Sequence, residues 1–293
     1  RMETFKRKIW EKFKAWKEES DGHTALLVEG ARRIGKSTAV EEFAKKEYET
    51  YILIDFAFAS QNIKNLFNDL SDLDHFFRML QYYTGKELIE RKSLIIFDEV
   101  QLFPLARQAI KLLVKDHRYD YMETGSLLSI KENVKDILIP SEERAIQMYP
   151  MDYEEFCWAI GQTNSFEIGR TIWQEKKSLG DDVNRDLMKK FRLYMIVGGM
   201  PQAVEAFIKT NNFSKVDLVK RDILKLYEND FMKFDSSGRS SLIFDHIPAE
   251  LQKNASRYQI SSVIENARAG TMLERIAKLQ DSKTVNIAYH ANA

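Results

Sequence analysis

The sequence predicts an α/β fold in which a parallel sheet is flanked by helices and followed by helical segments. Short apolar runs, each typical of a strand buried on both faces of a parallel sheet, alternate with amphipathic stretches in the first half of the chain. A loop containing two glycines joins the first run to a helical stretch, and helical periodicity dominates after residue 152. We therefore expect a core over 1–151, a helical lid over 152–238 and a partial winged-helix-like segment over 239–293.

The first expected element is an amphipathic helix over residues 5–19. Ile9, Trp10, Phe13 and Trp16 recur at helical spacing among lysines and glutamates. This pattern predicts a helix that packs against the sheet. Asp21 and Gly22 then turn the chain into the first strand, over residues 24–28.

The loop that follows this strand fits the pattern G-x-x-x-x-G-K-[ST], which is typical of a phosphate-binding loop. Its glycines let the backbone wrap closely around a polyphosphate, so that N–H groups and the next helix N-terminus face the anion. We expect Lys36 to contact the β- and γ-phosphates and Ser37 to bind Mg²⁺. The predicted nucleotide-binding residues are Gly30, Ala31, Arg32, Arg33, Ile34, Gly35, Lys36, Ser37 and Thr38.

The third apolar run ends in two carboxylates. Residues 51–56 form the second expected strand, and residues 93–97 form the third, which leads directly into Asp98 and Glu99. A strand end of this kind can deliver a carboxylate beside the phosphate loop. We expect Asp98 to hold Mg²⁺ through its water shell and Glu99 to activate or orient an attacking water.

Two further strands offer candidate catalytic groups. Residues 119–126 form the fourth expected strand, where Thr124 or Ser126 could contact the γ-phosphate or the water; capping of the next helix is the alternative. Arg144 begins the fifth strand, which Pro150 ends. This arginine could stabilise phosphoryl charge within the chain or across a subunit interface, or it could be a plain surface residue.

The C-terminal segment has three helical stretches, over residues 242–254, 261–268 and 272–279, followed by an expected strand over 284–289. Helices followed by a strand suggest the front of a winged helix, with 272–279 as the DNA-recognition helix. Phosphate contacts would then come from Arg275, Lys278 and Lys283, while packing within the chain is the alternative. Because the last strand has no partner after it, we expect the natural protein to continue beyond Ala293.

Composition narrows the function further. Lysine plus arginine and aspartate plus glutamate are both 44, so no basic excess indicates nucleic-acid binding. Cys157 is the only cysteine, which excludes an intrachain disulfide and favours a reducing compartment. The five histidines lack zinc-site spacing. No apolar run is long enough to cross a bilayer, so we expect a cytoplasmic protein with no membrane contact.

Taken together, these motifs resemble the AAA+ superfamily of P-loop ATPases. More narrowly, the chain is similar to a prokaryotic family with an AAA+ core and a largely uncharacterised C-terminal domain. The motifs that carry the likeness are residues 30–38, 97–101, 124–126, 149–156 and 198–201. The resemblance implies ATP as nucleotide, Mg²⁺ as cofactor, an extra strand between the two phosphate-site strands and a helical lid. Since N-terminal segments border the adenine in several ATPases, residues 5–19 could also do so.

Two hypotheses of function follow. The first is an ATPase that hydrolyses ATP to move its lid and C-terminal domain. An oligomeric form of this ATPase is compatible with the sequence. The second is a DNA-binding regulator in which ATP acts as a conformational ligand and turnover is slow or incidental. A GTPase is disfavoured because no Asn-Lys-x-Asp sequence follows the core, and an ABC-type ATPase because no Leu-Ser-Gly-Gly sequence is present.

Overall fold

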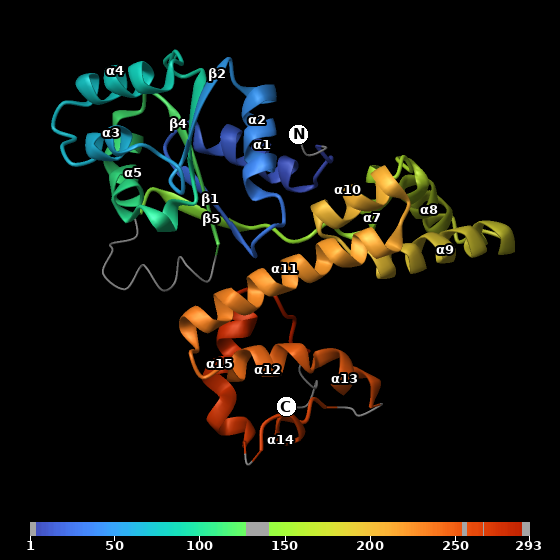
Figure 1. The fold of residues 1–293 in the computed structure, drawn as a ribbon. Helices are drawn as coiled ribbons and strands as arrows, with labels where there is room; N and C mark the ends of the chain where they lie inside the picture. Colours follow the sequence, from blue (N-terminus) through green and yellow to red (C-terminus); the bar gives the residue numbers. More distant parts are fainter. Residues whose placement is uncertain (1–3, 127–140, 254–256, 266, 289–293) are drawn as a thin grey trace.

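The computed structural model describes residues 4–126, 141–253, 257–265 and 267–288 of this chain. An α/β unit, a group of lid helices and a group of C-terminal helices follow one another along the sequence (Figure 1). The predicted α/β class with a helical C-terminal region is confirmed. The domain boundaries at residues 151 and 238 stay a prediction.

The sheet has five strands in the order β2-β3-β4-β1-β5, and every neighbouring pair is parallel. The strands are β1 (Ala25–Gly30), β2 (Thr50–Asp55), β3 (Ser93–Asp98), β4 (Asp120–Ser126) and β5 (Glu143–Gln147). Because β4 lies between β1 and β3, the sheet has the inserted strand that the resemblance implies. In the register, Gly30 pairs with Ser126 and Phe97 with Glu123. The carboxyl ends of β1, β3 and β4 therefore meet at one edge.

Helices cover both faces of this sheet (Figure 1). The first face carries α1 (Ile9–Ser20) and α2 (Lys36–Glu47); the second carries α3 (Gln61–Leu66), α4 (Leu73–Thr84) and α5 (Pro104–Asp116). Phe13 and Phe43 of the first pair of helices are buried in one hydrophobic cluster with Val28. Phe76 and Ile110 are buried with Phe97 in a second cluster. Burial on both faces is the reason that β1 and β3 appear as nearly continuous apolar runs.

The segment predicted as a lid, 152–238, begins with four helices that are called the lid helices below: α7 (Tyr153–Ala159), α8 (Ser165–Gln174), α9 (Asp181–Val197) and α10 (Pro201–Thr210). A capping box starts α7, in which Asp152 Oδ1 accepts from the Glu155 N–H at 2.9 Å and the Glu155 carboxylate accepts from the Asp152 N–H at 3.0 Å. Before α10 the chain passes Met151 so closely that a Cβ at Gly199 would lie 2.0 Å from the Met151 carbonyl oxygen. Only glycine fits there.

The 22-residue helix α11 (Phe213–Phe234) runs from the lid to the C-terminal helices and is roughly 33 Å long (Figure 1). Beyond it lie α12 (Arg239–Asp245), α13 (Ile247–Gln252), α14 (Ile260–Val263) and α15 (Ala269–Asp281). None of the helices in the described ranges is long and apolar enough to span a membrane.

The strand expected over residues 284–289 is wrong for its described part. Residues 285–288 have no regular secondary structure, and Tyr289 lies outside the described residues. A strand forms only where another strand offers unpaired N–H and C=O groups, and the described C-terminal segment contains helices alone. The expected helix 242–254 is two helices, which divide at His246 before Pro248.

A buried glutamate on β4 is a source of pH-dependent stability. Glu123 is fully buried, and neither of its carboxylate oxygens accepts a hydrogen bond from the described residues. Arg107 of α5 is engaged with Glu143, through Nε to Oε2 at 2.8 Å and Nη2 to Oε1 at 2.6 Å. Burial, reinforced by the charge of Glu143, raises the pKa of Glu123 well above its usual value.

We expect Glu123→Gln to stabilise the fold at neutral pH by about 1–3 kcal/mol, because glutamine mimics the neutral acid without the cost of an ionised group. A pKa that is higher in the folded state gives stability that is present below the unfolded pKa and is lost as pH rises toward the folded value. Thermal unfolding from about pH 5 to 8 should therefore show a flatter pH dependence in the variant. Exposed Glu87→Gln is the matched control; an unchanged pH profile for the Glu123 variant would contradict this account.

Candidate functional site

The loop of the phosphate-binding pattern lies at the carboxyl edge of the sheet, between β1 and α2. Gly35, at the start of α2, has a φ of 91° and a left-handed backbone, which favours glycine. A Cβ at Gly30 would lie 2.4 Å from the Met148 carbonyl oxygen. Because Gly35 supplies no side-chain cap, the first-turn N–H groups of α2 are available to an anion.

Lys36, the first residue of α2, is buried, and its ammonium group folds back over the loop. Its Nζ donates to the carbonyl oxygens of Gly30 at 3.2 Å and Ala31 at 2.7 Å. Burial lowers the pKa of Lys36 to about 8, while the charges of Glu99 and Asp98 act in the opposite direction. The Lys36 ammonium group therefore interacts electrostatically with both carboxylates.

Ser37 and Asp98 meet at this edge, as the metal-site prediction requires. The Ser37 hydroxyl donates to Asp98 Oδ1 at 2.7 Å, although 61 residues separate the two positions. Asp98 is buried, and burial raises its pKa above its usual value, although the hydrogen bonds from Thr124 and Ser37 act in the opposite direction. A hydroxyl and a carboxylate oxygen side by side are ligands that Mg²⁺ accepts. These residues fit a nucleotide-bound magnesium ion.

Thr124 belongs to the same group of contacts, and it bridges the two acidic residues. It is fully buried, its Oγ1 donates to Asp98 Oδ1, and the same Oγ1 accepts from the Glu99 N–H at 3.2 Å. Ser126 lies at the end of β4 and lines a small cavity with Gly30 and Ala31. The alternative role of these hydroxyls, capping of the next helix, concerns residues 127–140, which lie outside the described part of the chain.

Glu99 follows β3 in an unusual backbone conformation. It has φ 53° and ψ 44°, a left-handed geometry that costs a non-glycine residue about 1 kcal/mol or more. This bend starts the short 3₁₀ helix η1 (Val100–Leu102), and Gln101 within it donates from Nε2 to Glu99 Oε2. Gln101 belongs to the motif over residues 97–101, but nothing in that motif predicts its hydrogen bond to Glu99.

Arg144 does not join these residues. It lies at the amino end of β5, in register with Leu26, whereas the loop begins after Gly30 at the carboxyl end of β1. Its Nη1 lies 3.4 Å from Glu19 Oε2, and its side chain is half exposed. A catalytic role within the chain is therefore wrong, because parallel strands bring only their carboxyl ends to the loop. A role across a subunit interface stays a prediction.

The remaining loop residues divide by environment. Ala31 and Ile34 are buried among core residues, and Thr38 lies in the first turn of α2. Arg33 is exposed, with a left-handed φ of 66°. Arg32 instead faces α11, and no local signal in the sequence indicates the partner that it finds there.

Helix α11 contacts the loop directly through two side chains. Arg32 Nη1 lies 3.1 Å and 3.2 Å from the two carboxylate oxygens of Asp230, which is largely buried. One turn earlier, the Tyr227 hydroxyl donates to the Arg32 carbonyl oxygen at 2.8 Å. The long helix is thus attached to both the side chain and the backbone of one loop residue.

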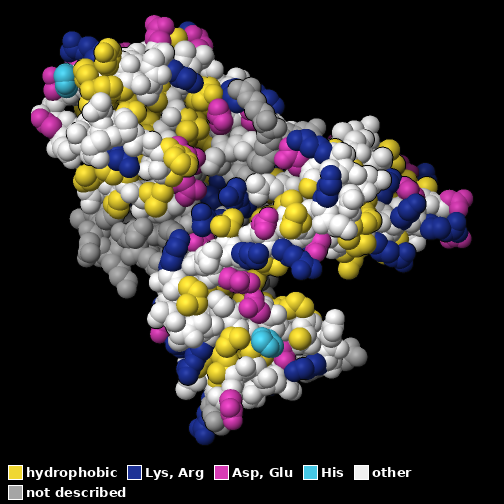
Figure 2. All heavy atoms as spheres, viewed as in Figure 1, with side chains coloured by type: hydrophobic (Ala, Val, Ile, Leu, Met, Phe, Trp, Pro, Cys, Tyr) yellow, Lys and Arg dark blue, Asp and Glu magenta, His cyan; other side chains and the backbone are white. Residues whose placement is uncertain are grey.

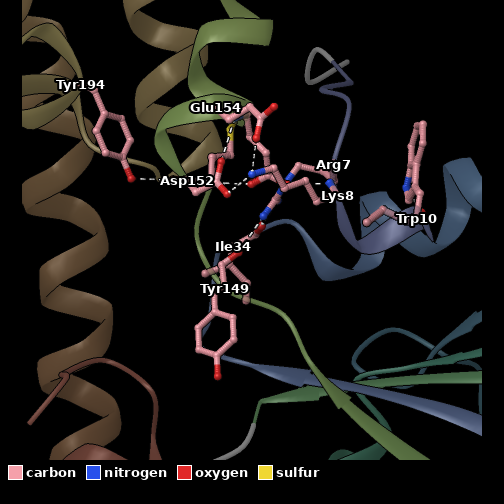
Figure 3. A network of polar contacts seen from close by, with 11 residues as sticks. Arg7, Lys8, Trp10, Ile34, Tyr149, Asp152, Glu154 and Tyr194 are labelled. Atoms are coloured by element: carbon pink, nitrogen blue, oxygen red, sulfur yellow. Dashed lines mark hydrogen bonds and ion pairs between the residues drawn. The ribbon is translucent and has the colours of Figure 1, made fainter. Parts of the chain in front are cut away.

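Arg7 is a second connection that the sequence analysis missed (Figure 3). Its Nη1 donates to the Ile34 carbonyl oxygen at 2.8 Å, and its Nη2 donates to that of Tyr149 at 2.6 Å. Its Nε lies 3.2 Å from Glu155 Oε1. The buried guanidinium therefore joins the loop, the exit of β5 and the first lid helix.

The neighbouring Lys8 strengthens this junction. Its Nζ lies 2.6 Å from Asp152 and 2.7 Å from Glu154, and its backbone N–H donates to Glu155 at 2.7 Å. Thr4, Phe5 and Arg7 also border a small cavity of about 20 Å³, together with Gly35 and Pro201. The N-terminal segment therefore lies beside the loop, while α1 packs on the sheet as predicted.

Two of the three cations expected to contact DNA, Arg275 and Lys278, form ion pairs within the chain. Arg275 Nε lies 3.0 Å from Asp235, and Lys278 Nζ lies 3.0 Å from Glu274. Basic and acidic side chains are interspersed over the helical part of the face in Figure 2. DNA contact through α15 therefore has little electrostatic support from these residues.

Comparisons with known proteins agree with the geometry of the loop. Residues 22–157 match a family model described as an AAA domain, and residues 188–293 match one described as a domain of unknown function (DUF8612). No curated protein matches the chain. Among solved structures, the chain is similar to the Holliday junction branch migration motor RuvB of Thermotoga maritima, with 11% sequence identity and a TM-score of 0.41. The match covers 95% of this chain and 88% of that chain. A TM-score this low carries no inference about function.

Proposed function

The chain carries an AAA domain followed by a domain of unknown function, and we propose that this AAA domain works as a P-loop ATPase. It binds Mg-ATP at residues 30–38 and hydrolyses the nucleotide. The cycle moves the lid helices and the C-terminal helices relative to the core.

The single observation that carries this proposal is the contact between Ser37 and Asp98. It joins the helix that follows the phosphate loop to the acidic end of β3, with 2.7 Å between the hydroxyl and carboxylate oxygens. Neither motif alone is specific, because glycine loops and acidic strand ends are common. Their convergence at the carboxyl edge of a parallel sheet is what a nucleotide site of this kind needs.

Each group then has a role in phosphoryl transfer to water. Lys36 exchanges its two carbonyl contacts for the β- and γ-phosphate oxygens. Ser37, and Asp98 through the water shell of the ion, would hold Mg²⁺, which would supply positive charge beside those phosphates. Thr124 fixes Asp98 and the backbone of Glu99. Glu99 orients the attacking water and accepts its proton.

The contacts around the loop support coupling between nucleotide state and the helical parts. Arg7 connects the loop to α7 through Glu155, and Arg32 connects it to α11 through Asp230. A bound triphosphate competes with Asp230 for the Arg32 guanidinium and so changes the position of α11. We also propose that residues 4–7 and Pro201 border the adenine, next to the small cavity at Gly35.

The direct test is ATP turnover by the purified chain of 293 residues. We expect phosphate release that requires Mg²⁺ and stops on its removal with EDTA, because the charge on the β- and γ-phosphates would then be left uncompensated. Titration of protein concentration shows whether assembly is needed. Absence of both ATP binding and Mg²⁺-dependent phosphate release would overturn the proposal.

The alternative of an ATP-gated DNA-binding regulator gives a different result in the same assay. It requires a salt-sensitive affinity for duplex DNA that depends on ATP, together with slow turnover. The ion pairs of Arg275 and Lys278 within the chain favour the ATPase. Duplex DNA added to the turnover and binding assays separates the two functions.

A further inference from the structure

Gln101 makes a hydrogen bond to the side chain of Glu99. The left-handed backbone at Glu99 turns the chain back on itself directly after β3. The turn is closed by the Leu102 N–H, which donates to the Glu99 carbonyl oxygen at 2.9 Å. As a result, Gln101 projects back toward the residue two positions earlier, and its Nε2 donates to Glu99 Oε2.

The surroundings of Gln101 hold its amide in place. Only 7% of the residue is exposed, and the preceding Val100 is fully buried in the second hydrophobic cluster. An ionised carboxylate can only accept hydrogen bonds, so the amide nitrogen must be the atom that faces Glu99. A buried donor of this kind restricts a glutamate side chain that otherwise has three rotatable bonds.

The backbone of Glu99 is fixed independently. Its N–H donates to Thr124 Oγ1 at 3.2 Å, and that hydroxyl donates in turn to Asp98. Glu99 also contributes the largest favourable charge interaction of Lys36. The glutamate is therefore held at its backbone by β4 and at its carboxylate by Gln101, on the side of the site that faces the loop lysine.

We infer that Gln101 is a positioning residue for Glu99, which sets the orientation of the carboxylate that activates water. This inference rests on the proposed ATPase function. Gln101 does not contact the nucleotide in this account. It acts only through the Glu99 side chain, so its loss should impair the chemical step and leave nucleotide binding unchanged.

The test uses two substitutions that keep the length of the side chain and remove its donor. We expect Gln101→Met and Gln101→Glu each to lower kcat by about 10- to 100-fold, the loss associated with misplacement of a catalytic group. The dissociation constant of a fluorescent ATP analogue should change by less than about threefold, because only the transition state is affected. Gln108→Met, at an exposed site on α5, is the matched control.

A double variant separates positioning from general structural damage. If Gln101 acts through Glu99, then Gln101→Met in the Glu99→Gln background should leave the residual turnover of Glu99→Gln unchanged. Independent effects would multiply instead and would overturn the inference. Wild-type kcat in both Gln101 variants, with Glu99→Gln inactive, overturns the inference alone. No ATP turnover in the wild type overturns the proposed function and the inference with it.

Discussion

Replacement of Glu99 by glutamine should retain ATP binding and lower turnover by about 10²- to 10⁴-fold, the range associated with loss of a general base. Glutamine keeps the shape of the side chain, but it cannot accept a proton from the attacking water. The phosphate contacts of Lys36 and of the loop do not depend on Glu99, so affinity should be preserved. Phosphate release and binding of a fluorescent ATP analogue, measured on the same preparation, check both parts.

The control for this variant is Glu87→Gln, which changes an exposed glutamate before β3. Unchanged turnover in the Glu99 variant would remove this residue from the mechanism. Loss of binding together with turnover would instead indicate that the carboxylate supports the loop, through the charge it presents to Lys36.

Lys36→Ala should weaken ATP binding itself. The substitution removes the cation that meets the β- and γ-phosphates, and a hydrogen bond to a charged group contributes about 1.5–3 kcal/mol, which corresponds to roughly 10- to 100-fold in affinity. Equilibrium binding of the fluorescent analogue in the presence of Mg²⁺ measures this change. Turnover at limiting ATP should fall at least as far, because the same charge also stabilises the transition state.

Lys12→Ala is the matched control, because Lys12 is an exposed lysine on α1. Lys36 also donates to Gly30 and Ala31, so the thermal stability of the variant should be measured alongside binding. Wild-type affinity in a folded Lys36→Ala protein would show that phosphates bind elsewhere.

Local sequence patterns were enough to predict the sheet, the phosphate-binding loop and the acidic end of β3. Strands β1 and β3 are buried on both faces and so appear as apolar runs, and the loop pattern and the acidic strand end lie within single short segments. Once parallel strands are assumed, their carboxyl ends must converge. That assumption alone brings Ser37, Asp98 and Glu99 together.

The contacts that the sequence did not predict join distant segments. Arg7 and Ile34 are 27 residues apart, and Arg32 and Asp230 are 198 apart, so no periodicity or motif links them. The catalytic role of Arg144 within the chain failed for a different reason: the residue begins a strand, and in a parallel sheet that is the end away from the loop. The terminal strand failed because a strand needs a partner, which the sequence pattern of one segment does not supply.

The attachment of α11 has a practical consequence for dissection of this protein. Tyr227, Phe231 and Ile223 share one hydrophobic cluster with Val28 and Met122 of the sheet. A fragment that stops before Phe213 would expose this apolar surface to water and deprive Arg32 of its carboxylate. The minimal unit suitable for expression should therefore extend through Phe234, well past the last residue of the AAA-domain match at 157.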